Sequence, residues 1–312
     1  MVTSGPTRSH AVATASAAVP PPVRPGPAAA PKLISQRRRQ LRTFAKNRPA
    51  LVGLVLILLI VAVALAAPLV APADPLAQSV RDRLDTPSAG HLLGRDDKGR
   101  DLVSRVVYGT RIALQVGLFS VLLGGVLGTA MGVGAGYFGG KVDTVLMRLT
   151  DVLLAFPDLI TGLLVLAVLG PGLWKMVLAI GLTIAPRFAR IAYGPTLAVK
   201  GQEFVEAARA VGSGDGRILR RHILPNVAGD LLVFGSLWTA SAIRLEASLS
   251  FIGLGVPPPT ATWGQMIREG TVHLSNAPLY SLGPGVALLI TVFAFNLVGD
   301  GLRDVLDPRS RT

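Results

Sequence analysis

Few residues of this chain have the types and spacing that catalysis or metal binding requires. The 312 residues include no cysteine, which excludes disulfides, thiol nucleophiles and cysteine-bound zinc. The histidines, His10, His91, His222 and His273, are far apart, and no two have the i, i+4 spacing of a helical metal site. No Ser/His/Asp set or pair of carboxylates stands at a defined spacing, although such groups can assemble from distant segments. We therefore expect no enzyme active site, no metal and no cofactor in this chain.

Two glycine-rich stretches look like nucleotide-binding loops but lie in the wrong context. Residues 134–139 fit the pattern GxGxxG, and Gly139-Gly140-Lys141 resembles the end of a phosphate-binding loop. The first pattern should follow a β-strand and open a helix, whereas here it closes an apolar segment. The second lacks the upstream glycine, and Val142 replaces the required Ser or Thr. Neither stretch predicts a nucleotide site.

The composition indicates a membrane protein. Hydrophobic residues make up 50% of the chain and charged residues only 16%, with a mean hydropathy of +0.53; a soluble domain has about 25% charged residues. The net charge of +13 raises the question of nucleic acid. The cations stand between apolar segments, however, and no basic stripe carries interleaved aromatic residues. We predict a multi-pass protein of the cytoplasmic membrane that contacts lipid and does not bind nucleic acid.

Six apolar segments predict an all-α, polytopic membrane protein with six transmembrane helices. A helix of about 20 residues crosses the roughly 30 Å of hydrocarbon. The segments are residues 50–70, 112–140, 142–169, 173–193, 227–249 and 282–298. The fourth is the least typical, because only eleven residues, 176–186, separate Lys175 from Arg187. With five helices instead of six, the two termini would lie on opposite sides of the membrane.

The distribution of Lys and Arg predicts that both termini are cytoplasmic. Residues 187–221 are rich in basic residues, whereas residues 253–281 carry only Arg268. The loop after the first helix is also rich in Lys and Arg and argues weakly against this orientation. Residues 64–66, Ala-Leu-Ala, resemble a signal-peptidase site, but the long basic preface and the length of the span favour a retained helix.

The chain divides into a tail, a basic segment and a membrane domain. Residues 1–36 are rich in Ala and Pro and predict a disordered cytoplasmic tail. Residues 37–49 are basic and precede a six-helix domain at residues 50–309. Within this domain we expect an external loop at residues 71–111, which includes a short surface helix, and a cytoplasmic loop at residues 196–226.

Four glycines recur at every fourth residue of the second apolar segment. Gly124, Gly128, Gly132 and Gly136 lie on one face of the predicted helix and leave it without side chains. Such a face allows a neighbouring helix to approach backbone to backbone. The stripe therefore predicts a helix-packing surface.

The cytoplasmic loop is too long and too patterned to be a simple connector. Its apolar residues recur at i, i+3, i+4 and i+7, namely Phe204, Ala207, Ala208 and Val211. This spacing predicts a short helix that presents one apolar stripe to a partner. Glycines from Gly212 onward end that helix, and a second, basic amphipathic helix is expected to run to Pro225. The alternative is a basic hairpin that lies on anionic lipid.

This loop resembles the cytoplasmic loop of the permeases of ATP-binding-cassette importers. That loop carries Glu-Ala-Ala, a glycine four residues after the second alanine, and a downstream Leu-Pro. The matching residues here are Glu206, Ala207, Ala208, Gly212, Leu224 and Pro225. The resemblance extends through residues 91–101, 135–140, 249–255, 263–264 and 296–309, and is to the second (C-type) permease of dipeptide and oligopeptide importers. One departure, Gly214 and Gly216 in place of bulkier residues, predicts a looser turn.

The resemblance implies a type I importer permease fold and a set of partners. These are a second homologous permease, two ATP-binding subunits that hydrolyse ATP, and an external substrate-binding protein. The residues implied to couple to an ATPase are Phe204, Glu206, Ala207, Ala208, Val211, Gly212, Leu224 and Pro225. The implied cargo is peptides, with nickel or another small solute as the alternative. An ion-coupled secondary transporter is a more remote alternative, because the sequence has no evident internal repeat.

Charged residues within the apolar segments are further candidates, since charge is costly in hydrocarbon. Asp158 is a candidate for the translocation path, where a carboxylate would attract the amino terminus of a peptide; an interhelical hydrogen bond is the alternative. Asp151 follows Arg148 by three residues, which favours a local ion pair. Arg244 and Glu246 lie about 200° apart on a helix, so we expect them to pair with other segments.

Overall fold

The computed structural model describes residues 44–306 together with Met1 and Gly5. The rest of the predicted tail, residues 37–43 of the basic segment and residues 307–309 lie outside the described residues. Every regular element in the described part of the chain is a helix. The helices are α2 (Arg48–Leu65), α3 (Ala67–Val70), η1 (Val80–Asp82), α4 (Leu102–Phe138), α5 (Gly140–Leu154), α6 (Asp158–Leu169), α7 (Leu173–Lys200), α8 (Glu203–Ala210), α9 (Asp215–Ile218), a π-helical turn η2 (Leu219–Ile223), α10 (Leu224–Ile252), α11 (Trp263–Thr271) and α12 (Leu279–Leu306).

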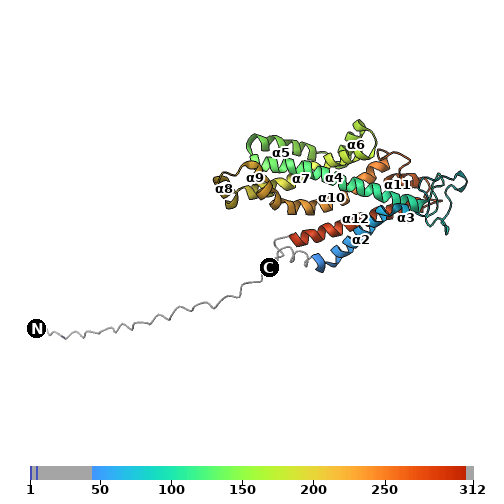
Figure 1. The fold of residues 1–312 in the computed structure, drawn as a ribbon, viewed down its shortest axis with the longest axis horizontal. Coiled ribbons are helices and arrows are strands. Elements are labelled where there is room, and N and C mark those ends of the chain that lie inside the picture. The colour runs from blue at the N-terminus through green and yellow to red at the C-terminus, as the bar shows by residue number, and fades with distance from the viewer. Residues whose placement is uncertain (2–4, 6–43, 307–312) are drawn as a thin grey trace.

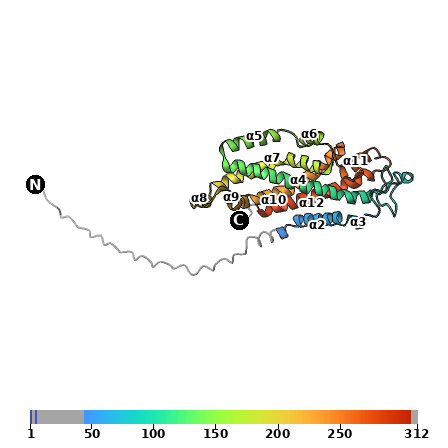
Figure 2. The ribbon, with the colours of Figure 1, turned by 45° about the horizontal axis from the view of Figure 1, so that its top comes forward.

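The helices form an elongated bundle (Figure 1). Helices α8 and α9 lie at one end, and α11 lies near the opposite end together with the loop that precedes α4. Figure 2 shows α5 and α6 along one side of the bundle. Among the described residues, five helices are long and apolar enough to cross a membrane, or six when the bent pair α5–α6 counts as one span. The prediction of an all-α, polytopic membrane protein is confirmed.

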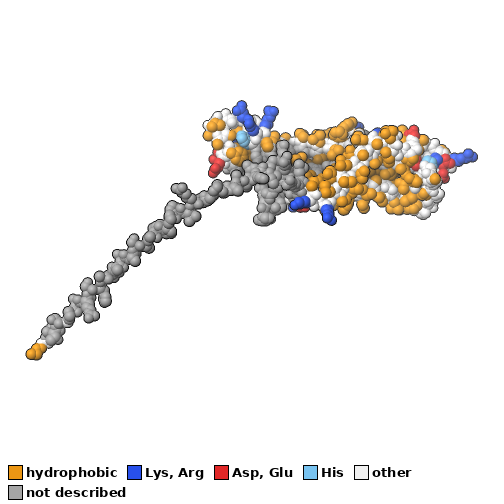
Figure 3. Space-filling model, turned by 60° about the horizontal axis from the view of Figure 1, so that its bottom comes forward, with side chains coloured by type: hydrophobic (Ala, Val, Ile, Leu, Met, Phe, Trp, Pro, Cys, Tyr) orange, Lys and Arg blue, Asp and Glu red, His pale blue; other side chains and the backbone are white. Residues whose placement is uncertain are grey.

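The outer surface of the bundle is apolar along its length. Figure 3 shows hydrophobic side chains over the long side of the molecule and charged side chains mainly at its ends. Large apolar side chains such as Leu58, Val168 and Leu289 are exposed. In water such a surface would be unfavourable, whereas in a bilayer it faces lipid.

The glycine stripe of α4 lies against α7. A Cβ atom at Gly128 or at Gly132 would overlap a carbonyl oxygen of α7. At Gly124 it would lie 2.6 Å from the carbonyl oxygen of Gly181, and at Gly136 3.0 Å from the Cβ of Thr196. Because the glycines have no side chains, the two backbones are in close contact. Small residues allow this kind of helix packing in membranes.

The fourth predicted span is the buried centre of the bundle. Helix α7 extends from Leu173 to Lys200 and contains Pro186 and Pro195. Residues along the whole helix are buried, among them Met176, Ile184 and Ala192. Neighbouring helices cover most of α7, so little of it contacts lipid. It therefore does not need an apolar segment as long as the membrane is thick. This explains why its apolar segment is short in the sequence.

The third predicted span is not one helix. Helices α5 and α6 are separated by residues 155–157 and bent by 96°. Pro157 has no backbone N–H, and its ring excludes the helical conformation of a continuing turn, so α5 ends before it. The prediction of a single continuous helix at residues 142–169 is therefore wrong at the bend.

Helix α4 starts ten residues earlier than predicted. The Asp101 carboxylate accepts a hydrogen bond from the backbone N–H of Ser104 at 2.7 Å and caps the helix. Residues 102–111, which we expected in the external loop, are helical. Polar side chains of this first part, Ser104, Arg105 and Thr110, are buried against the protein, which the sequence pattern of a lipid-facing helix does not reveal.

The second helix of the loop predicted at residues 196–226 does not stop at Pro225. Helix α9, the π-helical turn and α10 follow one another without a gap from Asp215 to Ile252. Pro225 is the second residue of α10, where its missing N–H costs little, and the wider π turn before it accommodates the ring. The loop is thus directly continuous with a membrane helix.

We predict that Gly128→Ala destabilises the protein and that Gly134→Ala does not. A methyl group at Gly128 meets the α7 backbone, and such overpacking costs about 1–3 kcal/mol. A Cβ at Gly134, on the same helix, would have its nearest neighbour at 3.8 Å, the Cδ1 of Leu146. Thermal unfolding of the two purified variants in detergent tests this difference. Equal melting temperatures would contradict the packing role of the stripe.

Candidate functional site

The predicted coupling residues gather at one end of the bundle (Figure 1). Phe204 is 45% exposed and Val211 82% exposed, and both lie outside the predicted membrane spans. Glu206, Ala207, Gly212, Leu224 and Pro225 are also exposed, whereas Ala208 is half-buried. The exposed apolar side chains leave a surface on α8 that no other described part of this chain covers.

Val205, which the sequence reasoning missed, holds α8 in place. Its side chain is fully buried and packs in one apolar cluster with Ile218, Ile223 and Val227. Ala208 packs against the same cluster. Val205 and Ala208 have the i, i+3 spacing of a helix face. The sequence therefore contains two apolar stripes on α8. The stripe of Val205 and Ala208 faces the rest of the protein.

Gly212 ends α8 with a specific turn. Its φ angle is +81°, and its N–H donates to the carbonyl oxygen of Arg209 at 3.0 Å. The N–H of Ser213 donates to the carbonyl oxygen of Ala208 at 3.0 Å. These two bonds form a Schellman motif, which requires a left-handed residue at the position of Gly212. Gly214 has an extended backbone and belongs to the next segment.

Two side-chain contacts attach α8 to the π-helical turn and α9 to α4. The rings of Phe204 and His222 lie 5.8 Å apart, which links α8 to the π-helical turn. The hydroxyl of Tyr137, at the end of α4, donates a hydrogen bond to Asp215 at 2.6 Å. Neither Tyr137 nor Asp215 was among the predicted site residues, although Tyr137 lies in the stretch 135–140 that carries part of the resemblance.

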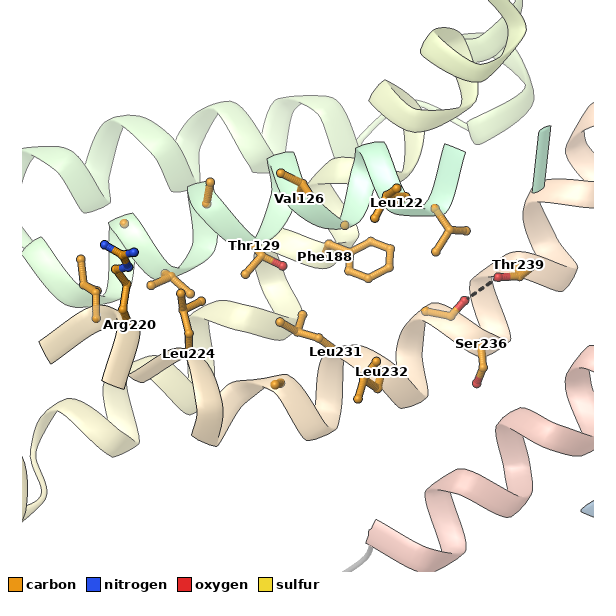
Figure 4. Close-up of a pocket in the computed structure, with 18 of the residues that line it drawn as sticks. Leu122, Val126, Thr129, Phe188, Arg220, Leu224, Leu231, Leu232, Ser236 and Thr239 are labelled. Carbon is orange, nitrogen blue, oxygen red and sulfur yellow. Dashed lines mark hydrogen bonds between the residues drawn. The ribbon is translucent and has the colours of Figure 1, made fainter. Parts of the chain in front are cut away.

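An apolar groove of about 1130 Å³ lies between α4 and α10. Figure 4 shows Leu122 and Val126 of α4 on one wall and Leu231 and Leu232 of α10 on the other. Phe188 of α7 lies at its base, and Arg220 is the one charged residue among those that line it. The groove thus connects the loop end of the molecule with the interior of the predicted membrane region.

Asp158, the predicted path residue, is paired across helices. Its carboxylate accepts a hydrogen bond from the Arg187 guanidinium of α7 at 2.5 Å. The same guanidinium lies over the ring of Trp238 of α10, 4.9 Å from its centroid. Arg187 therefore bridges α6 and α10. Both members of the ion pair are about one-third exposed.

The other predicted charge pairs within the spans differ from the expectation. Asp151 pairs with Arg190 of α7 rather than with Arg148 of its own helix, because α5 lies alongside α7. Glu246 accepts a hydrogen bond from Ser250, one turn further along α10, at 2.7 Å. Arg244 likewise bonds to a serine of its own helix. Arg244 and Glu246 do not bond to each other, as expected, but within the described residues each bonds to a serine of α10 rather than to another segment.

A buried ionic network lies at the opposite end. Asp96 is fully buried and bonds to the Nε of Arg100 at 2.6 Å, and the Nε of Arg105 lies 3.4 Å from the same oxygen. Tyr280 of α12 donates to Glu269 of α11 at 2.6 Å, and Arg100 approaches Glu269 as well. Paired in this way, the charges avoid the cost of isolated burial. The network fixes the loop before α4 onto α11 and α12.

Comparison with known proteins identifies the class to which this arrangement belongs. Residues 128–312 match the binding-protein-dependent transport system inner membrane components, and residues 35–87 match the N-terminal transmembrane domain of oligopeptide transport permease C. The chain belongs to this family of importer permeases, which are multi-pass inner membrane proteins and not themselves enzymes. As the permease of an ATP-binding-cassette importer, it functions with ATPase and substrate-binding partners.

Individual relatives are similar over most of their length. The glutathione transport system permease protein GsiD of Pectobacterium atrosepticum is 42% identical over 87% of this chain and 90% of its own. The dipeptide transport system permease protein DppC of Alkalihalophilus pseudofirmus is 37% identical over 94% of this chain and 96% of its own. An inward-facing structure of the MetNI methionine transporter covers 65% of this chain and 97% of its own, with a TM-score of 0.54 and 20% identity. That last likeness concerns the fold alone.

Proposed function

We propose that this chain forms half of the translocation path of an ATP-driven peptide importer. The observation that carries the proposal is the exposed helix α8, which is joined through α9 and the π-helical turn to α10, a wall of the apolar groove. A movement of α8 would therefore be passed along one continuous backbone to the membrane region. Rigid-body coupling of this kind is a known switching mode.

The partner at α8 is an ATPase subunit. The exposed Phe204, Ala207 and Val211 offer an apolar surface, flanked by Glu203, Glu206 and Arg209. This combination suits a groove in a soluble protein better than a lipid surface, because acidic side chains oppose binding to anionic lipid. Two ATPases, one for each permease, would complete the cytoplasmic side, with both termini of this chain on that side.

The partner at the apolar groove is a second, homologous permease. The groove is lined by α4 and α10 and is almost entirely apolar, so water would fill it unfavourably in an isolated chain. A matching permease would cover it and leave a path between the two chains. A substrate-binding protein would deliver the cargo at the other end, where the loop before α4 and α11 lie.

Peptides are the cargo best supported by the relatives. The names of the two relatives above refer to glutathione and to dipeptides, both of which are short peptides. The remaining cargo hypotheses are nickel or another small solute. A secondary transporter driven by an ion gradient is the one alternative mechanism we retain.

Uptake into vesicles tests the proposal directly. We expect vesicles that contain this chain, its partner permease, the ATPases and the binding protein to accumulate labelled di- and tripeptides only with ATP on the ATPase side. Accumulation driven equally by an ion gradient without ATP would reject the mechanism. Uptake of nickel or sugar but not of peptides, with ATP, would keep the mechanism and replace the cargo.

We predict that Gly212→Leu uncouples transport while Gly214→Leu does not. Leucine in the left-handed region costs about 1–2 kcal/mol, so the turn after α8 reshapes and uptake falls about fivefold or more. Gly214 has a φ of −70° and open space around its Cβ position, which makes it a matched control two residues away. Both variants should insert into the membrane normally. Unchanged uptake in Gly212→Leu would reject the coupling assignment.

We predict that Asp158→Asn lowers the uptake of peptides with a free amino terminus but not of N-acetylated peptides. The carboxylate would attract the ammonium group, and an amide would not. Asp151→Asn is the matched control, since it also removes a carboxylate paired with an arginine of α7. Vesicle uptake of both peptide types measures the effect. Normal uptake of every peptide by Asp158→Asn would remove this residue from the path.

A further inference from the structure

The side chain of Tyr137 is buried where the membrane helices meet the cytoplasmic loop. It is 4% exposed and belongs to the apolar cluster that contains Val205, Ile218 and Ile223. It is the second-last residue of α4, within the glycine-rich stretch 134–139 that has the letters but not the setting of a dinucleotide site.

The hydroxyl of Tyr137 meets charged groups from both helices of the loop. It donates a hydrogen bond to the carboxylate of Asp215, the first residue of α9, at 2.6 Å. The guanidinium of Arg209 of α8 interacts with the same hydroxyl, and this is the main cause that raises the pKa of Arg209 above its ordinary value. The hydroxyl thus lies between the carboxylate of α9, to which it donates, and the cation of α8.

The ring of Tyr137 is held by the end of α7. The Nζ of Lys200, the last residue of α7, lies 5.9 Å from the ring centroid. The preceding residue, Gly136, packs against Thr196 of α7. The tyrosine therefore stands on the α4–α7 pair, whose backbones meet at the glycine stripe. It extends from that pair to α8 and α9.

We propose that Tyr137 is a positioning residue that fixes α8 and α9 to the α4–α7 pair, so that a movement of the loop is passed to the membrane helices. Without this bond, α8 would remain attached through the apolar contacts of Val205 and through the chain itself. The loop would still fold, but it would move partly on its own. The proposal rests on the proposed function, because it assigns a residue to the coupling of ATP hydrolysis and transport.

Tyr137→Phe tests the role of the hydroxyl and keeps the ring in the cluster. A hydrogen bond to a charged group shifts an equilibrium by about tenfold or more, so we expect transport per ATP hydrolysed to fall by at least about tenfold in the complete reconstituted importer. Asp215→Asn should lower the same ratio. The double variant should be no worse than the worse single variant, because both remove the same interaction.

Tyr193→Phe is the matched control. Its hydroxyl donates to Asp143 at 2.9 Å and links α7 to α5, away from α8 and α9. The change in chemistry is the same, and the lost bond is also between a tyrosine and an aspartate. The ratio of transport to hydrolysis should stay at the wild-type value. An equal fall in both variants would overturn the specific role of Tyr137.

Loop mobility gives a second measurement that does not depend on transport. The chain has no cysteine, so Ala210→Cys, at the exposed end of α8, takes a single nitroxide label. We expect Tyr137→Phe, but not Tyr193→Phe, to increase the mobility of this label in the spin-resonance spectrum of the complete importer. Unchanged mobility together with an unchanged transport ratio would overturn the proposal. If the wild-type importer showed no ATP-driven uptake, the proposed function would fail. The mobility of the label would still show whether the bond between Tyr137 and Asp215 holds the loop.

Discussion

The close backbone contact between α4 and α7 is the constraint on which the rest of the structure depends. Within lipid, burying apolar side chains gives helices little reason to associate, so close packing and polar contacts must hold them together. The glycines of α4 bring its backbone against the carbonyl groups of α7. Neighbouring helices cover much of α7, and its arginines Arg187 and Arg190 are paired with carboxylates of the neighbouring span. Its position then determines where the other spans pack.

Arginines of α7 attach the bent third span to this pair. Arg187 reaches Asp158 at the start of α6, and Arg190 reaches Asp151 on α5. The break at Pro157 lies between the two contacts, so each half of the span has its own attachment. Arg187 also lies over Trp238, which extends the connection to α10. Charged groups that would be costly in lipid thus become interhelical contacts.

The two ends of the bundle differ in how firmly they are built. At one end, Asp96 and its arginines form a buried network that leaves the loop before α4 little freedom. At the other end, α8 rests on Val205 and a few polar contacts, and its outer face is exposed. A family that works through partner subunits needs such a surface. The proposed roles of α8 and Tyr137 both belong to this second end, where Phe204 and Val211 are exposed.

The sequence by itself determined the features that depend on residues close together in the chain. Apolar length predicted the spans, the four-residue spacing predicted the glycine face, and the Glu-Ala-Ala loop predicted a short helix ended by Gly212. These follow from helix periodicity and from the conformational freedom of glycine. Only the tertiary structure decided which segment meets which. It paired Asp158 with Arg187, 29 positions away, turned Val205 rather than Phe204 inward, and joined Tyr137 to Asp215. Local spacing cannot choose among distant partners, because that choice depends on how all the helices pack at once.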